Sequence, residues 1–499
     1  MNRPAAPKSP PEAEGYIAPR WSRVDAIIVA ALLLPAIATR FLHLGTPDAI
    51  VFDEKYTVGI ARAFLHRLPF RNTHPPLPGL LIALSIRILG DQPWSWRLPG
   101  AALGTALVCI TYLLGRRMFN SRLAGSLASI FVLCDGLFLV ESRIALWEIF
   151  YLTFAAQAYL LLFRFAQSSN RSLQRRIVAV IGVALGLSLA SKLLIPVITA
   201  ALVSVFLILL AAQNDFLRKS PTTNYAPLPQ MAAILALVGG TSAIVYMAFF
   251  LPNYWLGFWH GITDQLVYYS GEVHGQMAMT VGPRHHYDLS WWTWLLSQQP
   301  VIYWPDPGTL IDLDSGGVAI IALSNPVIIR GVTVAIPIVA IQAINRRSLP
   351  RAFLAVGYAA YVAMWALNPR FKFLYHYMPA LYLGFLAPAL VLTECWQGLA
   401  RRWQEMVMLA PMLLALIGGL GIRPAILIGV VVAAVYFELL RRYDGMAGKL
   451  TCAIVIVGAL CAFSYYLPVW SGMPLSPAAL RARMWVKVAT PAGWDGSGR

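Results

Sequence analysis

Long apolar stretches alternate with short polar connections along most of the chain. A helix needs about 20 mainly apolar residues to cross a bilayer, and thirteen stretches approach or reach that length. We predict membrane spans at residues 25–43, 98–115, 123–140, 145–163, 177–190, 194–212, 231–251, 327–344, 352–367, 374–393, 406–420, 422–440 and 451–468. This pattern predicts an all-α polytopic membrane protein.

One further apolar stretch, residues 75–90, is shorter and carries Arg87. We interpret it as a helix that lies in the membrane interface. The stretch FDEKYTVGIARAFL precedes it and has Tyr56, Ile60 and Phe64 at helical spacing, which favours an amphipathic helix. The sequence therefore predicts two interfacial helices in succession.

The basic residues orient these spans. Cytoplasmic loops of membrane proteins are rich in Lys and Arg, and the N-terminal tail is basic as well. If residues 75–90 do not cross, thirteen spans place six basic clusters on the same side as that tail. The clusters are Arg116/Arg117/Arg122, Arg164/Arg171/Arg175/Arg176, Arg218/Lys219, Arg346/Arg347/Arg351, Arg401/Arg402 and Arg441/Arg442/Lys449. We therefore predict a cytoplasmic N-terminus and an extracytoplasmic C-terminus.

This topology divides the chain into three parts. Residues 1–24 form a Pro/Ala-rich, disordered cytoplasmic tail, residues 25–468 a transmembrane catalytic domain, and residues 469–499 an extracytoplasmic tail. Two large outer loops, 44–97 and 252–326, hold most of the polar chemistry.

Composition supports this picture. Of the 499 residues, 58% are hydrophobic and only 12% are charged, about half the charged fraction of a soluble protein. The net charge of +17 would suggest nucleic-acid binding in a soluble chain. Here the basic residues lie mostly in short loops between apolar stretches, so membrane topology explains them. The five cysteines show no metal-binding spacing.

Two adjacent acids, Asp53 and Glu54, follow the first predicted span. Polar residues that mark a membrane exit are one explanation. A carboxylate held beneath two interfacial helices is another, because it could act as the general base for a hydroxyl nucleophile.

Basic side chains occur at several outer span ends. Arg143 suits a lipid-linked phosphate, since guanidinium binds phosphate through two donors, although snorkelling to the interface would also explain it. Lys192 fits either an anchor or a second phosphate contact. Arg370, Tyr375 and His376 lie close together in the sequence, where a short outer loop enters a predicted span.

Other candidates are less specific. Glu148 lies inside a predicted span, where an acid tends to be paired or functional. Trp291 and Trp292 fit an aromatic belt or a substrate-stacking surface. His274, His285, His286 and Asp288 lack regular ligand spacing. We therefore predict no metal site or cofactor and leave divalent-metal dependence open.

Several segments in order resemble the protein O-mannosyltransferase family, membrane glycosyltransferases of the GT-C class. They are FDEKYTVGIARAFL, THPPLPGLLIALSIRILGD, WRLPGAALGTALVCITYLLGRRMF, DGLFLVESRIAL, ALGLSLASK, SWWTW, SNPVI, FLYHYMPALY and SGMPLSPAALRARMW. The bacterial aminoarabinose transferases belong to the same superfamily. The chain departs from the pattern at Trp147-Glu148, where many relatives have Leu-Asp. It also has no room for the luminal domain of eukaryotic members, so we expect a bacterial-type enzyme in the cell membrane.

The resemblance implies inverting transfer of mannose from a polyprenyl-phosphate carrier to Ser or Thr of an exported protein. It makes Asp53 the catalytic base, gives Glu54 and His74 a role in positioning the acceptor or the sugar, and makes Arg143 the contact for the carrier phosphate. Lys192, Arg370 and His376 are further candidates for the phosphate pocket, and Tyr56, Glu148, Tyr375, Trp291 and Trp292 for substrate binding.

Two alternatives remain open. The first keeps the enzyme class but uses another sugar, such as aminoarabinose, or a glycolipid or cell-wall acceptor. The second is a flippase or transporter of lipid-linked sugars. Transporters usually place polar groups near the midplane of internally repeated helices, whereas here they gather at one face and no repeat is apparent.

Overall fold

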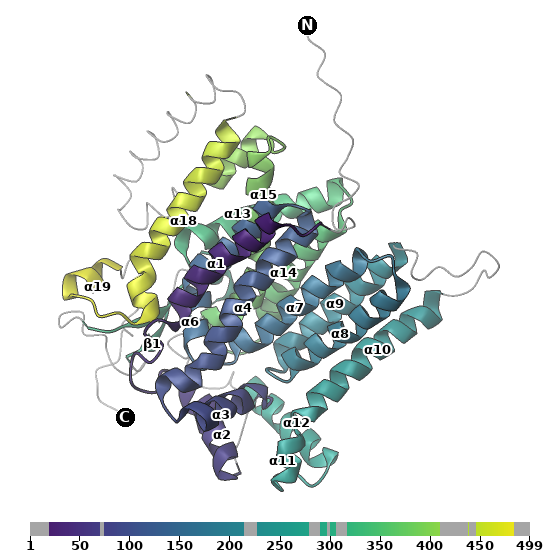
Figure 1. The fold of residues 1–499 in the computed structure, drawn as a ribbon, viewed down its shortest axis with the longest axis vertical. Coiled ribbons are helices and arrows are strands. Elements are labelled where there is room, and N and C mark those ends of the chain that lie inside the picture. The colour runs from purple at the N-terminus through teal and green to yellow at the C-terminus, as the bar shows by residue number, and fades with distance from the viewer. Residues whose placement is uncertain are drawn as a thin grey trace.

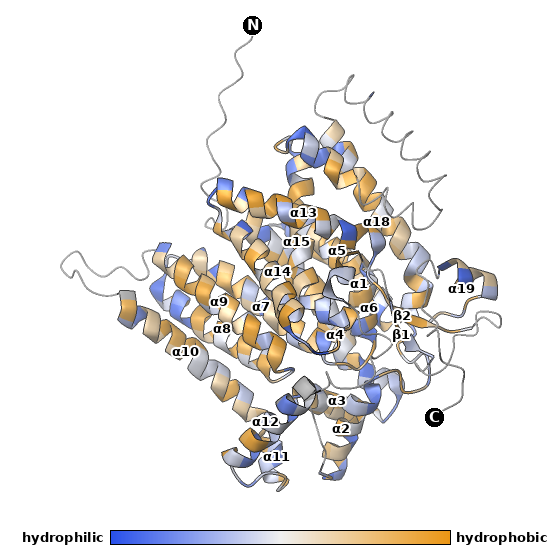
Figure 2. Cartoon of the chain, turned by 180° about the vertical axis from the view of Figure 1, so that it is seen from behind, coloured by the Kyte–Doolittle hydropathy of each residue, from blue (hydrophilic) through white to orange (hydrophobic). Residues whose placement is uncertain are grey.

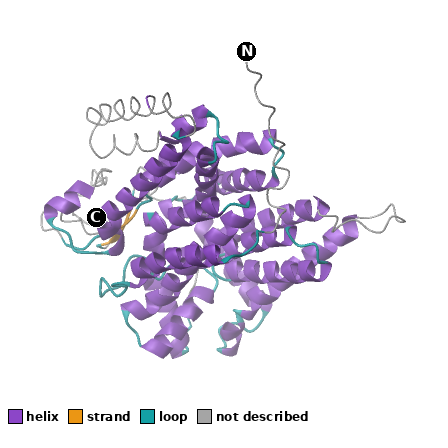
Figure 3. Cartoon of the chain, turned by 45° about the horizontal axis from the view of Figure 1, so that its top comes forward, coloured by secondary structure: helices purple, strands orange, loops and turns teal. Residues whose placement is uncertain are grey.

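The computed structural model describes residues 19–69, 74–213, 227–278, 290–296, 300–305, 317–409, 438 and 446–483. Helices account for most of these residues, and Figure 3 shows one small two-stranded sheet beside them. The N-terminal half contains α1 (Arg23–Phe41), α2 (Glu54–His66), α3 (Leu77–Leu89), α4 (Pro93–Phe119), α5 (Arg122–Cys134), α6 (Gly136–Arg143), α7 (Glu148–Ala166), α8 (Arg171–Leu189), α9 (Leu194–Gln213) and α10 (Pro227–Ala248).

The C-terminal half begins with short elements and returns to long helices. Its elements are α11 (Leu251–Trp255), α12 (Ile262–Ala278), the 3-10 helix η1 (Trp291–Leu296), β1 (Val301–Trp304), β2 (Ile320–Ala322), α13 (Pro326–Asn345), α14 (Leu349–Leu367), η2 (Leu374–Tyr377), α15 (Met378–Trp396), α18 (Ala447–Ser471) and α19 (Pro477–Arg483).

The described helices confirm a polytopic, all-α membrane fold. Nine of them are long and apolar enough to cross a membrane, or ten if one bent pair forms a single span. The predicted span 352–367 is helical as α14 but is not among these nine. The predicted spans 406–420 and 422–440 fall almost entirely outside the described residues, as does most of the predicted tail 1–24.

The predicted span 123–140 is not one straight helix. The chain bends by 62° between α5 and α6. The Asp135 carboxylate accepts a hydrogen bond from the Phe138 amide at the start of α6, and its other oxygen accepts one from the Asn325 amide. An aspartate that caps a new helix in this way competes with helix continuation.

Helices α2 and α3 form where the two interfacial helices were predicted. Figure 1 shows them at one end of the molecule, together with α11 and α12 from the second predicted outer loop. Helix α4 starts beside α3 and runs through the bundle for 27 residues, which is about 40 Å of helix. Its far end carries Arg116 and Arg117. In Figure 2 the long helices α8, α9 and α10 are largely apolar, whereas polar residues gather at the α2 and α11 end.

Gly136 allows the bend to pack, because a Cβ there would lie 1.9 Å from Trp470 Cε2 of α18 and 2.4 Å from the Leu323 carbonyl oxygen. We predict that Gly136→Ala lowers the apparent melting temperature in detergent, consistent with an overpacking cost of about 1–3 kcal/mol. Gly239→Ala on α10 is the control, because its Cβ would meet no atom within 4 Å. Equal melting temperatures for the two variants would contradict this packing.

Candidate active site

Asp53 occupies the N-cap position of α2 and is half-buried. Its carboxylate has no hydrogen-bond partner in the described part of the chain. Burial raises the pKa of Asp53 to about 6, with Lys55, Glu148 and Lys192 as charged neighbours. A carboxylate in these surroundings is a stronger base than an exposed aspartate and is free to accept a proton.

Glu54, the next residue, faces the interior and is fully buried. Its two oxygens accept hydrogen bonds from Arg97 Nε at 2.8 Å and Arg97 Nη2 at 2.9 Å, from the Val51 amide at 2.9 Å and from the Ala145 amide at 3.0 Å. These four bonds occupy the lone-pair sites of a carboxylate. Glu54 is therefore bound into the scaffold beside Asp53, and its role in positioning the acceptor or the sugar stays a prediction.

All N–H donors of Arg97, the partner of Glu54, form hydrogen bonds as well. Besides the two bonds to Glu54, it donates to the carbonyl oxygens of Leu44 and Pro47 through Nη1 and of Ala49 through Nη2. A guanidinium has five N–H donors: two bind the Glu54 carboxylate, and three bind carbonyl oxygens of the segment that leads from α1 to Asp53. Arg97 thus fixes the backbone that carries the candidate base.

Arg143 has a comparable structural role. Its Nη1 donates to the carbonyl oxygens of Thr39, Arg40 and Leu42 at the C-terminal end of α1, and its Nη2 to those of His43 and Ser471. A cation at a helix C-terminus satisfies carbonyls that lack intrahelical partners. These contacts join α1, α6 and α18 through Arg143, and its contact with the carrier phosphate stays a prediction.

Six other predicted residues do come together. Lys192 forms a buried ion pair with Glu148 at the start of α7, and its ammonium lies 5.8 Å from the centre of the Tyr375 ring. His74 and His376 both lie within electrostatic range of Lys192 and Arg370. Burial, with these cations, lowers the pKa of His74 well below its usual value. The cluster faces Asp53, whose electrostatic neighbours include Lys192 and Glu148.

The imidazole of His376 is held in place on two sides. It stacks on Trp365 with ring centres 3.9 Å apart, and its Nδ1 accepts a hydrogen bond from the Phe373 amide. Trp365 in turn contacts Trp294 edge-on, with ring centres 6.3 Å apart. The motif SWWTW thus supports the site through Trp294, which is buried, while Trp292 is 55% exposed and Trp291 is half-buried.

Glu141 and Tyr303 also belong to the site, although the sequence did not single them out. Tyr303 lies at an irregularity in the pairing of β1 with β2, and such bulges redirect side chains. Its hydroxyl donates to Glu141 Oε1, while Oε2 of this buried acid has no partner in the described residues. The Tyr303 ring stacks on Phe52 at 4.3 Å, directly before Asp53.

Tyr56 lies outside this cluster, since its side chain is 54% exposed and its ring contacts Lys55. In the described residues no group of three or more His, Cys, Asp or Glu side chains could hold a metal ion. His274 lies on α12, whereas His285, His286 and Asp288 fall outside the described residues.

Two family models match the chain. "Dolichyl-phosphate-mannose-protein mannosyltransferase" matches residues 73–262, and "C-terminal four TMM region of protein-O-mannosyltransferase" matches residues 271–489. Together they cover most of the chain, although Asp53 and Glu54 precede the first match.

Curated relatives carry related names. The chain is 26% identical to a polyprenol-phosphate-mannose–protein mannosyltransferase of Corynebacterium glutamicum over 60% of this chain and 68% of that protein. It is 33% identical to the Mycobacterium tuberculosis protein of the same name over 32% of this chain and 33% of that protein. The mycobacterial alignment therefore spans about a third of the relative's length.

Solved structures share the fold. The Saccharomyces cerevisiae protein O-mannosyltransferase Pmt1-Pmt2 complex bound to the sugar donor matches with a TM-score of 0.73 and 13% identity, covering 94% of this chain and 93% of that chain. ArnT from Cupriavidus metallidurans bound to undecaprenyl phosphate matches with a TM-score of 0.58 and 14% identity, covering 93% and 79%.

The buried pair of Glu54 and Arg97 generates a stability prediction. Removing one partner of a buried ion pair costs about 3–5 kcal/mol, so Arg97→Leu should strongly lower the apparent melting temperature in detergent. Arg62→Leu is the matched control, because its ion pair with Asp91 is exposed and such pairs contribute about 0–1 kcal/mol. A shift for Arg97→Leu no larger than that of the control would contradict the scaffold role.

Proposed function

We propose that this chain, which belongs to the protein O-mannosyltransferase family of GT-C membrane glycosyltransferases, is a mannosyltransferase. It transfers mannose from a polyprenyl-phosphate carrier to Ser and Thr hydroxyls of exported proteins. The observation that carries the proposal is the Asp53 carboxylate, which has no hydrogen-bond partner in the described residues and faces a cluster of cationic side chains. A hydroxyl acceptor needs a base, and a phosphate leaving group needs cations.

In the proposed reaction Asp53 accepts the proton of the acceptor hydroxyl. The hydroxyl oxygen bonds to the anomeric carbon from the side opposite the phosphate. The bond between that carbon and the phosphate oxygen breaks, and its electron pair leaves on the phosphate. A single displacement of this kind inverts the configuration at the anomeric carbon.

The departing phosphate gains negative charge, so cations placed beside it lower the barrier. We assign this role to Lys192 and Arg370, with the neutral imidazoles of His74 and His376 as hydrogen-bonding partners. Glu148 holds the Lys192 ammonium through their ion pair and acts as a positioning residue. Tyr375 lies within electrostatic range of Asp53, Glu148 and Arg370 and forms a wall of the same pocket.

We place this site at the extracytoplasmic face of the cell membrane. Along α4, Arg97 at the site and Arg116 near the far end are 19 residues apart, about 29 Å of helix, which is close to the thickness of the hydrocarbon core of a bilayer. Basic residues favour the cytoplasmic side, so the α2 and α3 end faces outward. The bilayer is then the medium through which the lipid-linked donor reaches Lys192.

The function is tested with purified enzyme supplied with several polyprenyl-phosphate sugars, a Ser/Thr peptide and a lipid acceptor. We expect transfer of mannose to the peptide, with inversion at the anomeric carbon. Transfer of aminoarabinose, or transfer only to the lipid, would replace the proposed substrates by the alternatives considered from the sequence. Movement of the donor without transfer would indicate a transporter.

Asp53→Asn keeps the shape of the side chain but removes the base, so the rate should fall by about 10²- to 10⁴-fold, the usual contribution of general base catalysis. Asp48→Asn makes the same change at an exposed position in the same loop and should leave the rate unchanged.

The base must be deprotonated to act, so kcat/KM of the wild type should rise with pH and level off above a midpoint at about 6. Below that midpoint the rate should fall about tenfold per pH unit. Near-normal turnover of Asp53→Asn, or a wild-type profile that is flat down to pH 4, would remove Asp53 from the base role.

A further inference from the structure

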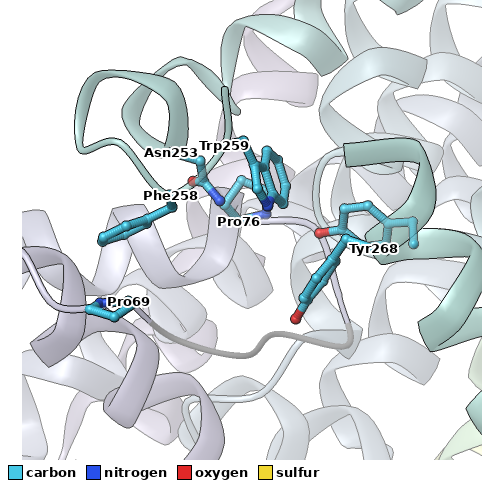
Figure 4. A pocket seen from close by; sticks show the side chains of 7 residues that line it. Pro69, Pro76, Asn253, Phe258, Trp259 and Tyr268 are labelled. Carbon is cyan, nitrogen blue, oxygen red and sulfur yellow. The ribbon is translucent and has the colours of Figure 1, made fainter. Parts of the chain in front are cut away.

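A cavity of about 180 Å³ is lined by Pro69 and Pro76, near α2 and α3, and by residues of α11, of the turn after it and of α12. Figure 4 shows Pro69 on one side, Tyr268 on another, and Asn253, Phe258 and Trp259 along the rim formed by α11 and the following turn. The described residues that line it are four aromatic residues, two prolines and one asparagine, and none of these seven side chains is charged. A cavity of this chemistry suits an uncharged ligand.

Asn253 provides the cavity with a hydrogen-bond acceptor that lacks a donor in the described residues. Its side chain is 5% exposed, and its Oδ1 has no hydrogen-bond partner in the described residues. The turn after α11 does not use this side chain, because the Phe258 and Trp259 amides donate to the backbone carbonyl of Asn253. A buried amide oxygen without a partner is costly, and a ligand that offers an N–H group would satisfy it.

The Trp259 ring, which lines the cavity, packs against neighbouring aromatic rings. Trp259 stacks on Phe250 with ring centres 5.4 Å apart and meets Tyr254 edge-on at 5.8 Å. Trp259 and Tyr268 are each half-buried, so part of each ring remains open. Rigid aromatic rings bind proline and other apolar side chains at little entropic cost.

The cavity adjoins the candidate active site. The Tyr269 hydroxyl, from α12, donates to the His74 carbonyl oxygen at 3.2 Å. The His74 ring in turn contacts Trp147, whose neighbour Glu148 holds Lys192. This series of contacts connects the wall of the cavity to the cluster around Lys192.

We propose that this cavity binds the acceptor polypeptide beside the Ser or Thr that is modified. One proline or other apolar side chain fills it, and a backbone N–H of the acceptor donates to Asn253 Oδ1. A polyprenyl chain offers no N–H or O–H donor for this oxygen, and the donor sugar must lie at Asp53. The inference rests on the proposed protein acceptor and gives it a site of selectivity.

The test compares two acceptors of wild-type and variant enzymes. One is a peptide with Pro or Leu at each position within four residues of a single Ser, and the other is N-acetylserine amide, which is too short to reach the cavity. Asn253→Leu should raise KM for the peptide by about 3- to 10-fold, the range expected for one hydrogen bond, and Trp259→Ala by at least as much. Neither variant should change KM for the short acceptor or for the lipid-linked donor. Trp255→Ala, which removes a 78% exposed ring of α11, is the control.

The outcomes separate the two proposals. If wild-type enzyme transfers sugar to neither acceptor, the proposed function fails. If it modifies both and the two cavity variants affect both acceptors equally, or have no effect, the cavity is not an acceptor site. A rise in KM for the donor alone would assign the cavity to the carrier lipid and overturn the inference.

Discussion

The Glu54 carboxylate lies where no solvent reaches it, and a buried carboxylate is stable only if its lone pairs are satisfied. Arg97 supplies two of the four hydrogen bonds, and the Val51 and Ala145 amides supply the others. The remaining N–H groups of Arg97 donate hydrogen bonds to backbone carbonyl oxygens of the segment before Asp53. This network joins α2, α4 and the turn between α6 and α7. It thereby fixes the position of the backbone that carries Asp53.

The same network explains why the Asp53 side chain is partly exposed. The Glu54 side chain, at the first turn of α2, is buried. Asp53, at the N-cap, is half-buried and lies near the cluster that contains Lys192. Phe52 adopts a left-handed conformation with a φ of 49°, which costs a residue with a Cβ about 1–2 kcal/mol. The stack of Phe52 on Tyr303 and the bond from Tyr303 to Glu141 hold it there. Strained backbone of this kind is common where a side chain must be aimed.

The apolar pattern predicted most of the helices because burial in lipid demands long apolar segments. It missed the bend at Asp135, because a capping aspartate looks like any polar residue in an apolar run. Asp53, Lys192, Arg370 and His376 were predicted as candidates from charge at outer span ends, and they do lie together. Arg97 and Glu141 were not singled out, and the backbone contacts of Arg143 were not predicted. Their partners are backbone groups or distant side chains, and no local spacing reveals such contacts.

The cluster around Asp53 draws on segments that are far apart in the chain, from Phe52 to His376. A ribosome-bound chain inserted as far as α7 already carries Asp53, Glu54 and Arg97, but it has neither Lys192 nor the Tyr303 that holds Phe52. The loop before α15, with Arg370 and His376, is synthesised later still. In the proposed mechanism, a partly inserted chain therefore carries the base without the cations that stabilise the departing phosphate, so the site becomes complete only late in synthesis.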